Sequence, residues 1–206
     1  EILDRERVDS VKACLSEALN DGRYSPEEEN KFLELADRLN VGLLYQDDMI
    51  QQMEKAKRLW KVENESLPII KTDIIMQNNE QCFYSNKGDF YEYKSITKRV
   101  MYAGPQIRLK ITKGFYYRLG KLDVAKQSED ILKKLDTGNF YITNKRIIFI
   151  GNYRTYSIRN NKIIDFELFS DGIKIIKDSG NNLLISFDGD SCIVGAILAR
   201  AISDYL

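Results

Sequence analysis

Histidine is missing from all 206 residues of this chain. Without an imidazole, the chain cannot assemble a Ser-His-Asp or Cys-His nucleophile, or a metal site with histidine ligands. Its three cysteines, Cys14, Cys82 and Cys192, lie far apart and match neither a disulfide framework nor zinc-ligand spacing. We therefore expect reduced, buried thiols in a cytoplasmic protein, with no metal site and no cofactor.

Long apolar runs and phosphate-binding loops are missing as well. No run approaches the roughly 20 apolar residues that a transmembrane helix needs. Gly138 and Gly151 bracket strand-like segments and do not open a helix. The chain begins with Glu1 and not with Met, so we expect it to be part of a longer protein. Whether a signal peptide, an anchor or another domain precedes Glu1 stays open.

The charges divide the chain into two parts. Residues 1–66 carry 10 basic and 16 acidic side chains, a net charge of −6. Residues 67–206 carry 21 basic and 15 acidic side chains, a net charge of +6. Opposite signs indicate two structural units that can attract one another. We predict an acidic helical unit at residues 1–65 and a β-rich unit at residues 66–206.

The acidic unit has the periodicity of amphipathic helices. Apolar residues recur at spacings of three and four over residues 2–19, from Pro26 onwards, and over residues 47–64. Ser25, with Pro26 after it and Glu28 three positions on, predicts a capping box at the start of the second helix. The turn at Asp21-Gly22, with the helix that follows, resembles the helical module of tellurite-resistance-type proteins.

From residue 67 the period changes from that of helices to that of strands. Short apolar or alternating segments are separated by turn signals, which is typical of an antiparallel sandwich or barrel. A last amphipathic segment follows Asp188-Gly189-Asp190, which we expect to cap a C-terminal helix that closes the open end of the sheet. The expected strands are residues 67–70, 81–84, 89–93, 106–112, 115–119, 155–159, 163–168, 173–176 and 183–187, together with a central hairpin at residues 138–151.

The central hairpin carries a resemblance to a known family. Its pattern is Gly138-x-Phe140-x-Ile142-Thr143-x-x-Arg146-Ile147-x-Phe149-x-Gly151, with the turn at Asn144-Lys145. This pattern resembles the core signature of bacterial pleckstrin-homology-like (PH-like) and GRAM-like domains, and the resemblance extends over about residues 67–206. It implies an α+β chain whose second unit is a bent antiparallel β-barrel capped by a C-terminal helix. It also implies a binding role, because such domains mostly hold lipid head groups or protein segments and are rarely enzymes.

The candidate binding surface is a basic stretch at residues 93–122. This stretch has eight Lys or Arg residues, no Asp or Glu, and five interleaved aromatic residues. The strand-like part of it, which we predict to be a hairpin added to the PH-like pattern, holds the candidate ligand-binding residues: Arg108, Lys110, Lys113, Arg118 and Lys121. Near a membrane each such cation contributes about 1 kcal/mol of attraction to anionic lipid.

Other interpretations of this stretch stay open. The cations could be the solvated face of a hairpin, or they could dock the acidic helical unit. They could also bind a protein partner, or nucleic acid through phosphate contacts and base stacking, which we regard as the less favoured ligand.

An enzyme would have to use carboxylate or lysine chemistry. Asp47-Asp48 is the most conspicuous acidic pair, but adjacent residues of a helix point away from each other. We therefore predict no catalytic residue. The sequence favours a non-catalytic binding or scaffold module that engages a protein partner or an anionic lipid head group. The alternative is a hydrolase-type enzyme with a carboxylate-lined pocket.

Overall fold

The computed structural model describes residues 2–42, 47–93, 107–112, 115–120 and 132–204. For residues 2–4, 47–48, 93, 107–112, 115–120 and 132 it describes the course of the backbone. The chain divides into two compact units, Glu1–Ser66 and Leu67–Leu206. The first unit is helical and the second is a β-sheet with a C-terminal helix, so the chain is of the α+β class.

The helical unit contains α1 (Ile2–Ala18), α2 (Pro26–Arg38) and α3 (Asp47–Asn64). The predicted capping box is confirmed at the start of α2. The hydroxyl oxygen of Ser25 accepts a hydrogen bond from the Glu28 N–H at 3.2 Å, and the Ser25 N–H donates to Glu28 Oε2 at 2.8 Å. Both bonds satisfy backbone groups that a helix end would otherwise leave without partners.

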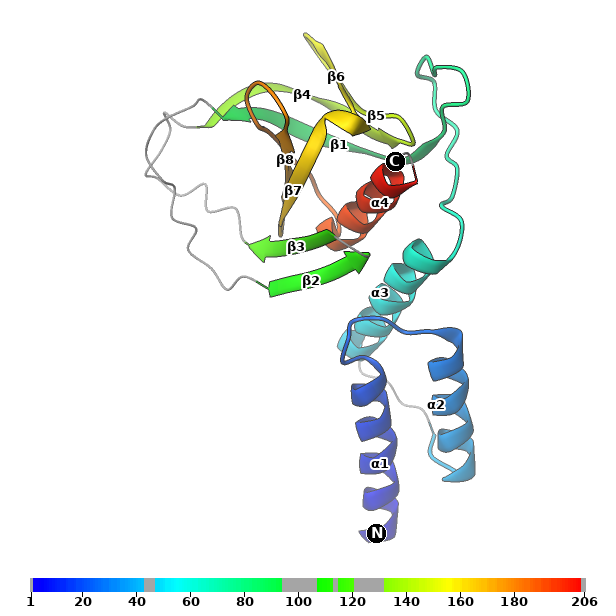
Figure 1. Ribbon diagram of the computed structural model, residues 1–206. Helices are drawn as coiled ribbons and strands as arrows, with labels where there is room; N and C mark the ends of the chain where they lie inside the picture. The colour runs from blue at the N-terminus through cyan, green and yellow to red at the C-terminus, as the bar shows by residue number, and fades with distance from the viewer. Residues whose placement is uncertain (1, 43–46, 94–106, 113–114, 121–131, 205–206) are drawn as a thin grey trace. The chain divides into compact units, whose positions relative to one another are not determined.

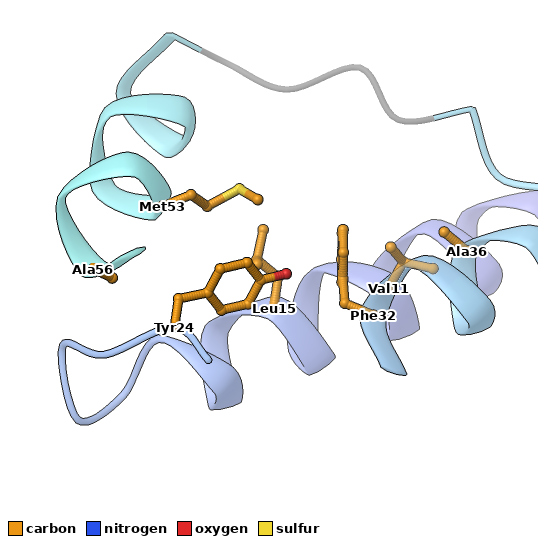
Figure 2. Packing of buried hydrophobic residues seen from close by; sticks show 7 residues of the cluster. All are labelled: Val11, Leu15, Tyr24, Phe32, Ala36, Met53 and Ala56. Atoms are coloured by element: carbon orange, nitrogen blue, oxygen red, sulfur yellow. The ribbon is translucent and has the colours of Figure 1, made fainter. Parts of the chain in front are cut away.

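Seven buried side chains from the three helices and the α1–α2 turn form the core of this unit, as Figure 2 shows. Tyr24, from the turn, is 2% exposed and lies beside Leu15 of α1 and Met53 of α3. The ammonium of Lys57 lies 5.6 Å from the centre of the Tyr24 ring. The core therefore ties the turn to α1 and α3. The seven core residues are Val11, Leu15, Tyr24, Phe32, Ala36, Met53 and Ala56.

The second unit is built on one sheet, whose nine strands are ordered β2-β3-β7-β8-β9-β1-β4-β5-β6 within the described residues. Seven neighbouring strands, from β7 to β6, pair antiparallel. The strands are β1 (Cys82–Tyr93), β2 (Ile107–Thr112), β3 (Phe115–Gly120), β4 (Leu132–Thr143), β5 (Arg146–Gly151), β6 (Thr155–Arg159), β7 (Ile163–Phe169), β8 (Gly172–Lys177) and β9 (Leu183–Ser186).

The predicted central hairpin is confirmed as β4 and β5. Gly138 lies opposite Gly151 in the register, and a Cβ added to Gly138 would overlap the Ile150 carbonyl oxygen. The close approach of the two strands therefore requires glycine at position 138. The second strand of the hairpin lies inside the sheet, because β5 lies between β4 and β6 and residues 147–149 are all buried.

The C-terminal helix, α4 (Ser191–Ser203), packs against β1, β4, β7 and β8. The carboxylate of Asp190 accepts hydrogen bonds from the N–H groups of Cys192 and Ile193, so the predicted N-cap is confirmed. The short 3₁₀ turn Asn160–Lys162 also contacts α4. The Asn160 side-chain amide donates to Thr143 O of β4 at 3.1 Å and to Ala201 O of α4 at 3.2 Å.

The sheet is not closed into the predicted barrel. In the described residues the order of strands in the sheet ends at β2 on one side and at β6 on the other. The reason is that both edges of β7 are occupied. One edge pairs with β8, and the other pairs in parallel with β3 of the added hairpin, through Leu119↔Leu168 and Gly120↔Phe169. That edge of β7 is therefore not available to β6. The parallel pair is also an exception to the expected antiparallel pattern.

Two strand predictions are wrong. Residues 67–70 are irregular, and the hydrogen bond from Ile70 N–H to Cys82 O, at 2.8 Å, does not continue into a ladder. Pro68 lacks an N–H to donate, which disfavours a strand at this place. Residues 81–84 and 89–93 are not separate strands, because β1 runs on through Gly88, which lies opposite Gly138 of β4.

Candidate functional site

The predicted ligand-binding residues divide into two groups in the structure. Arg108 and Lys110 lie on β2, and Arg118 lies on β3. Lys113 and Lys121 lie outside the described residues. The predicted hairpin is thus confirmed, and three of the five candidate residues have a defined place in its register.

The register places the basic residues together. Arg108 lies opposite Arg118, and Lys110 lies opposite Tyr116. Residues opposite one another in an antiparallel pair share one face, so positions 108, 110, 116 and 118 belong to a single face of the hairpin. The alternate positions carry Ile107, Leu109, Tyr117 and Leu119. We call positions 108, 110, 116 and 118 the basic face of the hairpin.

Two arginines directly opposite each other are unfavourable on their own. Like charges at facing positions of an antiparallel pair destabilise the pair. A ligand with negative charge would remove this cost, and it would gain from arginine in particular, because a guanidinium can form two parallel hydrogen bonds with a phosphate or carboxylate. The register of Arg108 and Arg118 is therefore suited to an anionic group.

The second charged cluster lies at the β4–β5 turn. Arg146 Nε donates to Glu80 Oε1 at 2.8 Å, and a terminal nitrogen of Arg146 donates to Glu80 Oε2 at 2.9 Å. The Glu80 side chain is fully buried, and that of Arg146 is 18% exposed. Glu80 also accepts hydrogen bonds from the Thr143 hydroxyl at 2.8 Å and from the Gln77 N–H at 2.7 Å. This network fastens the irregular segment 75–81 to the turn.

The network determines the ionisation of Glu80. Burial disfavours the carboxylate and raises its pKa, but the hydrogen bonds from Arg146, Gln77 and Thr143 favour the charged form. The net result is a pKa below the ordinary value of 4.5. Glu80 is therefore ionised and fully engaged at neutral pH.

A second buried carboxylate, Asp136, holds the β5–β6 turn. It is 4% exposed, and it accepts backbone N–H donors from Thr137, Asn152, Tyr153 and Arg154 at 2.9 to 3.1 Å. Burial raises the pKa of Asp136, and the four N–H donors more than offset this, so the pKa lies below the ordinary value of 3.8. The turn presents Tyr153 to solvent with 88% of its surface exposed.

These contacts assign structural roles to the two buried carboxylates. Glu80 and Asp136 each accept four hydrogen bonds from the protein, which leaves little capacity for general acid–base chemistry. Within the described ranges, no group of three or more Cys, Asp or Glu side chains could hold a metal ion. Asp47 and Asp48, the acidic pair noted in the sequence, begin α3.

Neither carboxylate network was predicted from the sequence. Arg146 and Glu80 lie 66 positions apart in the chain, and neither residue carries a local signal for the other. Asp136 lies close to Gly138 and Gly151, and a Cβ on Gly151 would overlap the Asp136 carboxylate. The glycine at 151 was therefore the available signal for a side chain packed against the turn.

None of the helices in the described parts of the chain combines the length and the apolar character needed to cross a bilayer.

Comparison with known proteins gives little further information. No protein-family model matches the chain, and no curated protein matches it. A crystal structure of the C-terminal domain of an unknown protein from Leishmania infantum matches 61% of this chain and 87% of that chain, with a TM-score of 0.35 and 11% identity. A likeness at this level carries no argument about fold or function, so the function must be inferred from the residues of this chain.

Proposed function

We propose that the chain is a non-catalytic, PH/GRAM-like binding module whose basic hairpin face engages an anionic lipid head group. The observation that carries this proposal is the register of β2 and β3, which assigns Arg108, Lys110 and Arg118 to one face. The PH-like part of the proposal is supported by seven antiparallel strands and a C-terminal helix packed on the sheet. The open sheet and the added hairpin are departures from that pattern.

The charge balance of the second unit supports an anionic partner. The basic stretch at residues 93–122 contains eight Lys or Arg residues and no acidic residue that could neutralise them from within the stretch. Phosphate and carboxylate head groups at a membrane surface would supply the missing negative charge. The alternate positions of the hairpin, Ile107, Leu109 and Leu119, are apolar, which suits a hairpin with one face toward protein and the other toward a ligand.

Liposome co-sedimentation tests this proposal. The probe is a vesicle of phosphatidylcholine with phosphatidylserine or phosphatidylinositol 4-phosphate, and pure phosphatidylcholine is the reference. We expect binding that depends on anionic lipid and weakens with salt. The variant Arg108→Gln/Arg118→Gln removes two cations, each contributing about 1 kcal/mol, so the partition coefficient should fall about 30-fold.

The matched control changes the same net charge elsewhere. Lys12→Gln/Lys31→Gln removes two exposed cations from the helical unit, and we expect its binding to change much less. Equal sedimentation of the unmodified protein with anionic and neutral vesicles would overturn the proposal. If both double variants lost vesicle binding equally, the net charge of the protein alone, and not the basic face, would account for the attraction to the membrane. If a random oligonucleotide bound saturably and in a salt-dependent way while vesicles did not bind, the ligand of the basic face would be nucleic acid and not lipid.

A further inference from the structure

Among the described residues the sheet ends at β6, and some backbone N–H and C=O groups of this strand have no partner there. Antiparallel partners alternate between residues that exchange hydrogen bonds and residues that do not. The bonds from Gly151 N–H to Arg154 O and from Asn160 N–H to Lys145 O fix that alternation. With the printed register of β5 and β6, Tyr156 and Ile158 bond to β5, whereas Thr155, Ser157 and Arg159 direct their N–H and C=O groups away from it.

These three residues form an open edge. All are exposed, and in the part of the chain that the structure describes no strand pairs with this side of β6. Figure 1 shows β6 at the end of the sheet, beyond β5. An edge of this kind is a template for an additional strand, and proteins use it to bind extended peptides by backbone hydrogen bonds.

The charge around the edge selects the partner. From Thr137 to Ile164 the chain contains no Asp or Glu, but it contains Lys145, Arg146, Arg154, Arg159 and Lys162. Asp136, whose carboxylate accepts from the Arg154 N–H, is buried and is already occupied by four backbone donors. Arg146 is neutralised by Glu80 and Lys162 by Asp178. Arg154 and Arg159 are exposed, stand at the two ends of the edge, and have no ion pair within the described ranges.

We propose that β6 binds an extended acidic segment of another protein, which adds to the sheet as a strand beyond β6. The N–H and C=O groups of Thr155, Ser157 and Arg159 pair with the backbone of this segment. Arg154 and Arg159 pair with acidic side chains at its two ends. Arginines on an edge repel a second basic strand, so the same residues that admit an acidic segment disfavour self-pairing. This surface does not depend on the lipid-binding role of the hairpin.

Amide chemical shifts and hydrogen exchange test the proposal. The probe is the peptide acetyl-Glu-Glu-Val-Thr-Val-Thr-Glu-Glu-amide, added to the full chain, and the control peptide has Lys in place of every Glu. We expect saturable shifts at residues 155, 157 and 159, and slower exchange of their amides, with the acidic peptide alone. Absence of shifts at millimolar peptide would overturn the proposal.

Two pairs of variants separate the backbone contribution from the charge contribution. Ser157→Pro removes an N–H that does not bond to β5, so the sheet keeps its ladder while binding is lost, and Ser157→Ala keeps the N–H and the binding. Arg154→Glu/Arg159→Glu should reverse the preference, so that the Lys peptide binds and the Glu peptide does not. This reversal is a gain of binding that an unfolded variant could not show.

The remaining outcomes are also decisive. If Ser157→Pro folds and binds the acidic peptide as well as Ser157→Ala does, strand addition is refuted. If the charge-reversed variant keeps the original preference, the acidic specificity is refuted. If the amides of 155, 157 and 159 become protected as the protein concentration rises, without any peptide, the occupant is a second copy of this chain and the proposal is wrong.

Discussion

Removal of Arg146 should destabilise the β unit far more than removal of an ordinary surface arginine. In Arg146→Ala, the buried carboxylate of Glu80 loses two charge-assisted hydrogen bonds, at 2.8 and 2.9 Å. Breaking a buried ion pair from one side costs about 3–5 kcal/mol. Because the Arg146 side chain is 18% exposed, water can solvate part of the site, and we expect a loss near 3 kcal/mol in the free energy of unfolding.

The Glu80–Arg146 ion pair should also make the free energy of unfolding depend on pH. The pKa of Glu80 is lower in the folded protein than its ordinary value of 4.5, which applies to the unfolded chain. A carboxyl group of this kind stabilises the fold above its unfolded pKa, and the stabilisation is lost as the pH falls through the folded pKa. The destabilisation by Glu80→Gln should therefore be complete at pH 7 and should shrink as the pH falls below 4.5.

Urea unfolding, followed by two signals, measures both effects. Amide NMR signals of β4 and β5 follow the β unit, and the fluorescence of Trp60, the single tryptophan, follows the helical unit. We expect Arg146→Ala to shift the first transition only. The double variant Glu80→Leu/Arg146→Met should lose less than Arg146→Ala, because neither charge is left buried alone.

A loss below about 1 kcal/mol for Arg146→Ala, the size typical of exposed ion pairs, would contradict the buried character of the Glu80–Arg146 pair. A double variant Glu80→Leu/Arg146→Met that loses as much stability as Arg146→Ala, or more, would contradict it too, since removal of the second charge would then bring no relief. As a matched control, Arg154→Ala removes an exposed arginine of the neighbouring turn and should change the stability by less than about 0.5 kcal/mol.

Three further substitutions test the local structure. Gly138→Ala places a methyl group against the Ile150 carbonyl oxygen, so we expect a loss of about 3 kcal/mol or more in urea unfolding, and a wild-type stability would contradict the close approach of β4 and β5. Ser25→Ala removes the capping hydroxyl and should cost about 1 kcal/mol in the Trp60 transition. Asp136→Asn should speed hydrogen exchange at the Tyr153 amide at pH 7, because the carboxylate that accepts from this amide is lost. The folded pKa of Asp136 lies below 3.8, so the difference in exchange rate between the variant and the wild type should decrease as the pH falls below that value.

Local signals in the sequence predicted most of the secondary structure. The capping box at Ser25 and the N-cap at Asp190 are set by residues a few positions apart, and both are present as predicted. The strand at residues 155–159 has the predicted bounds, because period-two alternation and a neighbouring turn signal fix it locally. The added hairpin was predicted in the same way, from the strand-like segments at residues 106–112 and 115–119.

Features that depend on contacts distant in sequence were not predicted. The parallel pair of β3 with β7 joins Leu119 to Leu168 and has no local signature, yet it occupies the edge that a closed barrel would have used. The Glu80–Arg146 pair is another example, since each residue alone is typical of an exposed loop or turn. The candidate basic residues were selected by composition, which indicates a charged segment but does not indicate which of its members share a face.

The two proposed surfaces lie on strands that are far apart in the sheet. The basic hairpin face is at the β2 end of the strand order, and the peptide edge is at the β6 end. Seven strands stand between β2 and β6, so a ligand on one surface does not compete for the residues of the other. It follows that Arg108→Gln/Arg118→Gln should leave the peptide-induced shifts at Ser157 unchanged, and that Ser157→Pro should leave vesicle binding unchanged. A variant at one end that abolished both activities while the protein stayed folded would mean that a single surface, or a coupling through the sheet, accounts for both.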